Sequence, residues 1–274
     1  LGTGAGELGA WAYPDKKSQF LWELPEGLSA DALCREVAAA TGMDPETTLI
    51  SERHLKVYSA TAPEMPPPHK DRSASGVTVG IGVDIPEESR LVMWPDVDPV
   101  YNPYPTAAEW RETRHPEELP EKVTQGHAPV EVDLRRGDVV MFRGANLYHE
   151  RYRPACTSVL YLKFNDLGLD PLGEDPRTVE AEAASAAARA EGIDPGTTMS
   201  VSPRLIGLRS DEFFPNLGTS VYARTIDSER AIRLTDEEAD VLRSLATRGP
   251  AAVMDSGGVA MAERLVDLGL AVLS

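Results

Sequence analysis

Six short stretches of alternating apolar and β-branched residues constrain the fold of this chain most strongly. They are HLKVYSA (54–60), VTVGIGVDI (77–85), SRLVMWP (89–95), APVEVDL (128–134), DVVMFRG (138–144) and SVLYLKF (158–164). Side chains of a strand alternate between two faces, and Pro, Gly and Asp turns separate these stretches. The pattern predicts a mainly β core, either a sandwich or a barrel.

Helices are expected on both sides of this core. The stretch 29–41 begins with the N-cap Ser29 and stops at Gly42, and residues 178–192 form an Ala-rich helical pattern. Near the C-terminus, Thr235 and Glu238 form a capping box ahead of two amphipathic helices and a short apolar end. That order predicts a small winged-helix-like module.

Three regions are expected along the chain. Residues 1–170 would form the β domain with its N-terminal helix, 171–227 a helical and irregular bridge, and 228–274 the winged-helix-like appendage. Packing or homodimer formation is the leading role for the appendage, and recognition of a carrier protein is the alternative. Within the first region, the segment 96–128 is expected to form a substrate lid, and the aromatic and proline-rich stretch 94–110 reads equally as a packed Ω-loop.

Composition excludes several classes of protein. The formal net charge is −17, so the surface repels phosphate backbones and a nucleic-acid partner is not expected. Two distant cysteines, Cys34 and Cys156, indicate neither a disulfide framework nor a zinc ribbon. No apolar run is long enough to span a membrane, and no secretory signal is recognisable, which favours a cytoplasmic location.

Three side chains form a candidate metal site. His69 and Asp71 are an H-x-D pair after the Pro-rich PEMPPPHKD, and alternation places both on one side of an extended chain. His149 follows RRGDVVMFRGANLY, in which a turn and a buried strand lead to the histidine. Two imidazoles and one carboxylate leave coordination positions open, as in non-haem Fe(II) oxygenases. His54 and His127 are alternative ligands, but neither has a suitable carboxylate neighbour.

The order PPPHKD followed by GDVVMFRGANLYH resembles the phytanoyl-CoA hydroxylase-like branch of the Fe(II)/2-oxoglutarate dioxygenases, over roughly residues 50–165. The resemblance implies a double-stranded β-helix (jelly-roll, cupin-like) fold and a reaction in which Fe(II), 2-oxoglutarate and O2 oxidise a substrate, giving succinate and CO2. Because halogenating relatives lack the carboxylate ligand, Asp71 favours hydroxylation. Desaturation, epoxidation and cyclisation stay open.

The family usually anchors the far carboxylate of 2-oxoglutarate with an Arg about ten positions after the distal histidine, where this chain has Val159. Lys163 is our first candidate for that anchor, because it shares a strand face with Val159. Arg151 and Arg153 are alternatives, since a guanidinium can bind a carboxylate through two hydrogen bonds. The hydroxyls of Thr78 and Ser158 are further candidates for the same site.

Substrate contacts are expected mainly from the segment 96–128 and its neighbours. The candidates are Arg90, Trp94, Tyr101, Asn102, Tyr104, Trp110 and Arg143. The expected substrate is a small molecule, such as an amino acid or a natural-product intermediate, free or tethered to a carrier.

Other functions stay open on the sequence alone. A cupin-type metal dioxygenase or isomerase would not need 2-oxoglutarate, and a non-catalytic ligand-binding or regulatory β-domain would need no iron. A protein hydroxylase with a winged-helix appendage is a further alternative.

Overall fold

The computed structural model describes residues 11–13, 17–62, 67–211, 220–225 and 232–274. The chain divides into two compact units, Leu1–Leu167 and Gly168–Ser274. The expected bridge 171–227 is therefore not a separate region, because its described strands and helix fold together with the C-terminal helices. None of the helices in the described ranges is both long and apolar enough to cross a bilayer.

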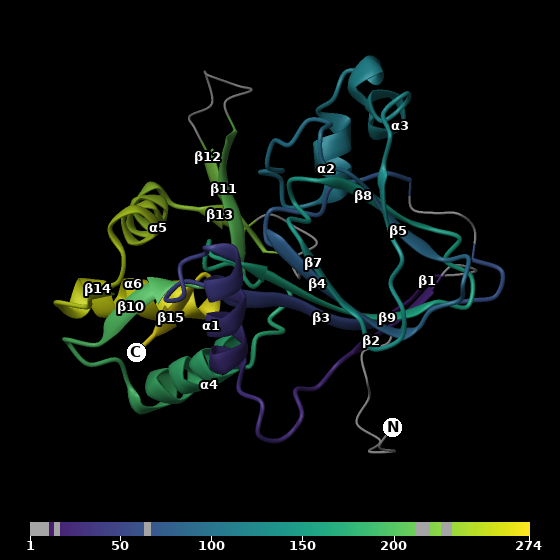
Figure 1. Cartoon of the computed structure of the whole chain (residues 1–274). Coiled ribbons are helices and arrows are strands. Elements are labelled where there is room, and N and C mark those ends of the chain that lie inside the picture. The colour runs from purple at the N-terminus through teal and green to yellow at the C-terminus, as the bar shows by residue number, and fades with distance from the viewer. Residues whose placement is uncertain (1–10, 14–16, 63–66, 212–219, 226–231) are drawn as a thin grey trace. The chain divides into compact units, whose positions relative to one another are not determined.

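The first unit is built around two antiparallel sheets (Figure 1). The larger sheet has the order β1-β2-β3-β9-β4-β7 and the smaller one the order β6-β5-β8. The strands of the larger sheet are β1 (Trp11–Tyr13), β2 (Lys17–Leu21), β3 (Leu49–Tyr58), β4 (Val77–Asp84), β7 (Val139–Phe142) and β9 (Ser158–Asn165). Those of the smaller sheet are β5 (Arg90–Trp94), β6 (Val130–Val132) and β8 (Tyr148–Tyr152). All six predicted stretches are strands.

From β3 onwards the chain passes back and forth between the two sheets. After β3 it pairs with β8 of the smaller sheet through a bridge between His69 and His149, and then enters β4 of the larger sheet. β5 and β6 belong to the smaller sheet, β7 to the larger, β8 to the smaller and β9 to the larger. Strands distant in sequence are therefore neighbours in space.

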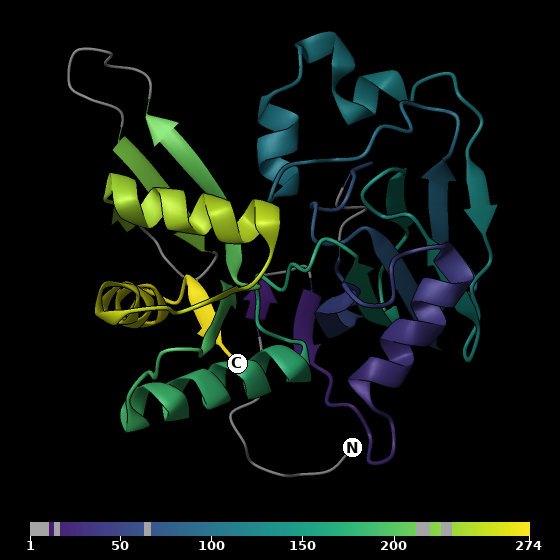
Figure 2. The same ribbon diagram turned by 90° about the vertical axis from the view of Figure 1, so that its left-hand side faces the viewer.

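The two faces of the larger sheet differ in polarity. One face packs against α1 (Ala30–Thr41), with Cys34, Val37 and Phe164 in a shared core (Figure 2). As predicted, Ser29 caps α1 by accepting a hydrogen bond from Ala32 N, and Gly42 ends it in the left-handed conformation, with a φ of 75°. Residues on the opposite face are largely polar. The register places Glu52 opposite Lys163 and His54 opposite Tyr161.

The segment 96–128 contains α2 (Ala107–Glu112), the 3-10 helix η1 (Pro116–Glu118) and α3 (Pro120–Val123). Val97 and Val123 pack with Val92, Trp94 and Tyr148 on the outer face of the smaller sheet. Trp94 therefore belongs to a packing core.

Lys70 fixes this segment to the loop that carries the candidate ligands His69 and Asp71. Its fully buried ammonium donates to the carbonyls of Asp98 and Val100 and to the carboxylate of Asp98. It also lies 4.9 Å from the ring centroid of Trp110 and 4.6 Å from that of Tyr148. Lys70 thus points away from the face on which its neighbours His69 and Asp71 meet.

The second unit has its own core. It contains the sheets β14-β10-β15 and β11-β12-β13, packed with three helices. The helices are α4 (Pro176–Glu191), α5 (Asp236–Arg248) and α6 (Ser256–Asp267). The strands are β10 (Thr198–Val201), β11 (Leu205–Asp211), β12 (Ser220–Thr225), β13 (Ile232–Leu234), β14 (Ala251–Ala252) and β15 (Ala271–Leu273). The irregular stretch expected before Asp227 is instead partly β-structure.

The predicted capping box at α5 is present. The Thr235 hydroxyl accepts from Glu238 N at 3.2 Å, and the Glu238 carboxylate accepts from Thr235 N at 2.7 Å. Thr235→Ala should therefore lower the free energy of unfolding of the second unit by about 1 kcal/mol. Thr247→Ala is the control, because Thr247 only donates back to helix carbonyls. Chemical denaturation would test this, and equal effects of both changes would contradict it.

Candidate metal centre

His69, Asp71 and His149 converge at one point between the two sheets. Their nearest ligand atoms all lie within 4.8 Å of one another. Two backbone hydrogen bonds hold the histidines side by side, His69 N to His149 O at 3.1 Å and His149 N to His69 O at 3.0 Å. The set predicted from sequence is thus brought together by the bridge between a loop residue and β8.

Both imidazoles are prepared to bind a metal. Nδ1 of His69 lies 3.0 Å from the carbonyl of Pro67, and Nδ1 of His149 lies 2.9 Å from that of Leu147. A carbonyl can only accept, so Nδ1 donates and Nε2 keeps a lone pair for an ion. Burial, with the neighbouring His149, lowers the pKa of His69 to about 3, and burial also lowers the pKa of His149. Both rings are therefore neutral at pH 7.

Asp71 supplies an ionised carboxylate. Lys163 Nζ donates to Oδ1 at 2.6 Å, and the Thr78 hydroxyl donates to Oδ2 at 2.9 Å. Burial alone would raise the pKa of Asp71, but Lys163 and the two histidines outweigh it and hold that pKa well below its usual range. Asp71 Oδ2 lies 3.8 Å from Nε2 of His149. Two neutral imidazoles and one carboxylate are the donor set of a non-haem Fe(II) site.

The backbone around Asp71 is fixed from two sides. Asp71 N donates to the carbonyl of Gly144 at 2.9 Å, and the buried amide of Asn102 donates to the carbonyl of Asp71 at 2.8 Å. A Cβ at position 144 would lie 2.4 Å from Asp71 Oδ2 and 2.5 Å from Thr78 Oγ1. Only glycine leaves room for the carboxylate here.

A polar cavity opens beside these ligands. The described residues that line it are Lys56, Tyr58, His69, Asp71, Leu91, His149, Arg151, Tyr161 and Lys163. They come from β3, β9, β5, β8 and the loop that carries His69, so both sheets contribute. Leu91 is the single aliphatic side chain in this lining.

Lys163, the first candidate for the 2-oxoglutarate anchor, is already paired with acids. Besides Asp71, its ammonium lies 3.5 Å from the carboxylate of Glu52, which in turn lies 3.0 Å from the guanidinium of Arg72. Burial would lower the pKa of Lys163, but Asp71 and Glu52 raise it above its usual value. Lys163 is therefore charged and oriented toward the candidate ligand Asp71.

Arg151 offers hydrogen-bond donors that no described residue uses. Its side chain is buried, with 4% of its surface exposed, and Nη2 donates to the hydroxyl of Tyr161 at 3.1 Å. Nε and Nη1 are buried without a hydrogen-bond partner. A buried donor left unpaired costs about 1–3 kcal/mol, so a cavity-lining guanidinium of this kind fits an anionic ligand.

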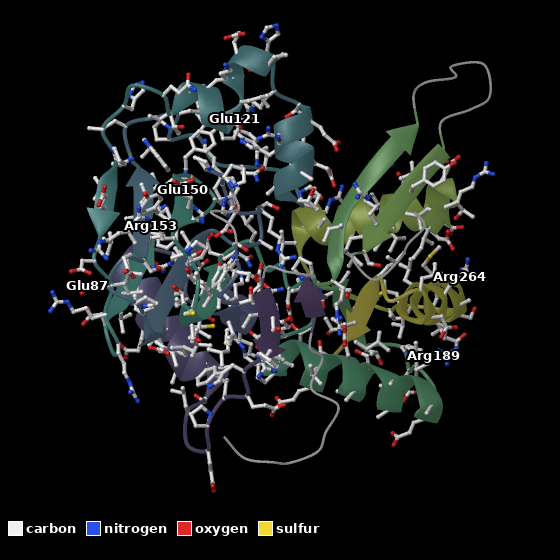
Figure 3. All side chains as sticks on the ribbon, turned by 90° about the vertical axis from the view of Figure 1, so that its right-hand side faces the viewer. Glu87, Glu121, Glu150, Arg153, Arg189 and Arg264 are labelled. Carbon is white, nitrogen blue, oxygen red and sulfur yellow. The ribbon has the colours of Figure 1, made fainter. Side chains whose placement is uncertain are left out.

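The other predicted anchors lie elsewhere. Arg153 follows the end of β8, has a φ of 46° and is exposed, with its guanidinium 5.2 Å from the ring centroid of Tyr152 (Figure 3). Ser158 is absent from the cavity lining, because alternation along β9 places Val159, Tyr161 and Lys163 on the inner face. Thr78 does not line the cavity, and it contacts the site only through its hydrogen bond to Asp71.

None of the seven predicted substrate residues lines the cavity. Arg90 lies 3.6 Å from Asp133, and Arg143 donates to the carbonyl of Thr41. Tyr101 donates to the carbonyl of Ser73, and the rings of Tyr104 and Trp110 pack at a tilt, with centroids 5.9 Å apart. Trp94 belongs to a packing core, and Asn102 donates to the backbone carbonyl of Asp71. Most of these side chains therefore stabilise the segment 96–128 and its surroundings.

Sequence reasoning missed three polar residues of the cavity, Lys56, Tyr58 and Tyr161. A signal for the first two was present, because His54, Lys56 and Tyr58 alternate along one face of β3. Burial, together with Tyr161, raises the pKa of Tyr58, so its hydroxyl stays protonated. His54 is buried, with its Nδ1 3.7 Å from the carboxylate of Glu52.

No protein-family model matches the chain, and no curated protein sequence matches it. Among solved structures, the non-heme alpha-ketoglutarate-dependent epimerase SnoN from nogalamycin biosynthesis is 17% identical, with a TM-score of 0.35, over 60% of this chain and 69% of its own. The E. coli protein ycfD is 15% identical, with a TM-score of 0.31, over 94% of this chain and 79% of its own. Similarity at this level assigns no function.

Gly144→Ala should weaken metal binding about 10–100-fold, because the added methyl group displaces Asp71 from the two histidines. Titration of the apoprotein with Fe(II) under nitrogen would measure this. Gly257→Ala is the matched control, since a Cβ there meets Asp255 Oδ1 at 3.4 Å, which is ordinary contact. Unchanged affinity in Gly144→Ala would show that the carboxylate is not a ligand.

Proposed function

We propose that this chain is an Fe(II)/2-oxoglutarate-dependent oxygenase that hydroxylates a small organic molecule. The observation that carries the proposal is the convergence of His69, Asp71 and His149, with both imidazoles neutral and their Nδ1 atoms turned to carbonyls. Arg151, with two unpaired donors in the same cavity, supplies the second requirement, a site for a carboxylate. The candidate metal ligands and the candidate site for a carboxylate therefore line the same cavity.

The strand order supports a double-stranded β-helix as the fold of the first unit. Between β3 and β9 the chain passes repeatedly from one antiparallel sheet to the other, and the candidate ligands lie on the inner side. We retain the phytanoyl-CoA hydroxylase-like branch as the proposed subfamily on the motifs PPPHKD and GDVVMFRGANLYH. The order α5, β14, α6, β15 likewise supports a winged-helix-like module in the second unit.

Bound Fe(II), with 2-oxoglutarate and O2, would supply oxidising chemistry that amino-acid side chains lack. His69, Asp71 and His149 would hold the ion. Thr78 and Lys163 orient the carboxylate of Asp71 by donating to its two oxygens. Such hydrogen bonds to metal ligands fix their geometry and strengthen metal binding. Both sheets line the cavity, and Asp71 and His149 are buried within it.

Arg151 is our proposed anchor for the far carboxylate of 2-oxoglutarate, in preference to Lys163. Its free Nε and Nη1 can donate to an anion without breaking an existing ion pair. Lys163 would have to leave Asp71 or Glu52 to do the same. Tyr161 accepts from Nη2 of Arg151 and keeps the guanidinium in the cavity. The retained carboxylate of Asp71 favours hydroxylation over halogenation.

The reaction is tested by succinate formation from 2-oxoglutarate in the presence of Fe(II), O2 and a panel of amino acids and carboxylic acids. Asp71→Ala and His149→Ala should each abolish both stoichiometric Fe(II) binding and succinate formation, because two ligands do not hold the ion. His127→Ala is the control, since His127 is exposed and lies outside the site. Iron binding without any 2-oxoglutarate turnover would favour a cupin-type metal enzyme instead.

The anchor is tested by the affinity for 2-oxoglutarate of Fe(II)-loaded protein under nitrogen. Arg151→Met should raise the Kd about 100-fold, because two charge-assisted hydrogen bonds of about 1.5 kcal/mol each are lost. Lys163→Met should act mainly on Fe(II) affinity through Asp71, and the exposed Arg153→Met should change neither. A large rise in Kd from Lys163→Met alone would transfer the role to Lys163.

A further inference from the structure

We propose that the substrate of this enzyme is a carboxylic acid whose carboxylate binds the ammonium of Lys56 in the metal cavity. The inference rests on the proposed function, since it assigns a second anion to a site already expected to hold 2-oxoglutarate. It follows from where Lys56 lies, from what surrounds it and from the charge of the cavity.

Lys56 is placed in the cavity by the alternation of β3. It lies on the same strand face as Glu52 and Tyr58, and it lines the cavity together with the three candidate metal ligands. Its side chain is partly buried, with Nζ 5.2 Å from the ring centroid of Tyr161. Within the described part of the chain, its ammonium makes neither a hydrogen bond nor an ion pair. Lys56 therefore presents an unneutralised cation to the cavity.

The cavity as a whole has more positive than negative charge. Among the described residues lining it, Lys56, Arg151 and Lys163 are basic and Asp71 alone is acidic. Glu52 also contacts Lys163, but its other oxygen is paired with Arg72. The chain has a formal net charge of −17, so this concentration of cations differs from its overall composition. The cavity lining is therefore locally basic in an acidic protein.

Binding of the metal ion and the cosubstrate does not remove this excess of positive charge. The two positive charges of Fe(II) and the two negative charges of the 2-oxoglutarate dianion cancel. Arg151 would pair with the cosubstrate, and Lys163 is paired with Asp71. Of the three basic side chains in the lining, Lys56 is the one that contacts neither an acidic side chain nor the cosubstrate. Because an unpaired charge in a low-dielectric site is unfavourable, a ligand that brings a carboxylate would be bound preferentially.

The electrostatic environment of Lys56 agrees with this assignment. Burial and the nearby Lys163 lower the pKa of Lys56, against the opposing effects of Glu52 and Asp71. A carboxylate in contact with Nζ would favour the charged form. A ligand carboxylate would thus supply the anionic partner that Lys56 lacks among the described residues.

Thermal unfolding of the full-length apoprotein separates a binding role of Lys56 from a structural one. If Lys56 serves binding, Lys56→Met removes an unneutralised charge at nearly equal volume and should raise Tm by about 2–4 °C. Lys122→Met is the matched control, because it removes one positive charge from an exposed lysine and should leave Tm unchanged. A fall in Tm in Lys56→Met, with Lys122→Met unchanged, would mean that Lys56 is a structural residue and would overturn the proposal.

Direct binding is measured on protein saturated with Fe(II) and 2-oxoglutarate under nitrogen. The probes are pairs of an acid and its amide: L-aspartate and L-asparagine, L-glutamate and L-glutamine, benzoate and benzamide. At least one acid should bind tenfold or more tightly than its amide, and Lys56→Met should remove that difference. If no acid binds more tightly than its amide, or if Lys56→Met leaves the preference intact, the proposal is wrong.

The affinity for 2-oxoglutarate distinguishes failure of this proposal from failure of the proposed function. Lys56→Met should leave the Kd for 2-oxoglutarate within about twofold of the unaltered protein, and the acid should not displace it. If 2-oxoglutarate binds but no acid preference appears, only the substrate assignment fails. If neither the unaltered protein nor Lys56→Met binds 2-oxoglutarate, the oxygenase proposal fails as well, and the acid site with it.

Discussion

The pairing of the Lys163 ammonium with Asp71 and Glu52 is the interaction on which the interior of the first unit depends. Moving charged groups from water into a protein interior costs several kcal/mol for each ion unless close partners compensate. Here Lys163 lies between two carboxylates, Arg72 contacts Glu52, and Thr78 completes the hydrogen bonding of Asp71. The polar face of the sheet can be buried because these groups neutralise one another, and the same contacts orient a candidate metal ligand.

The strands and the first helix could be predicted because their signals are local. Alternation identifies a strand from a few consecutive residues, and the cap at Ser29 and the left-handed Gly42 bound α1 from its own sequence. The candidate ligands were also accessible, because His69 and Asp71 are two residues apart and His149 has a recognisable context. These features need no knowledge of distant contacts.

The features that could not be predicted from the sequence depend on contacts between residues far apart in the chain. Alternation alone would place Arg151 and Arg153 on the same face, yet β8 ends at Tyr152 and the positive φ of Arg153 turns it outward. The ion pairs of Lys163 depend on the register of β9 against β3 and β4, which no single segment specifies. In the second unit, a register shift between Leu205 and Gly207 interrupts the alternation of β11. Because this shift breaks the pattern, the sequence of residues 205–211 indicates an irregular segment although they form a strand.

Lys70 connects the segment 96–110 directly to the candidate metal ligands. It stands between His69 and Asp71 in the chain, and its ammonium is held by the carbonyls of Asp98 and Val100 on the far side of that short stretch. Asn102, in the same segment, donates a hydrogen bond to the backbone carbonyl of Asp71. Sequence variation in this segment, even at positions remote from the cavity, would thus change the spacing of the candidate metal ligands His69 and Asp71.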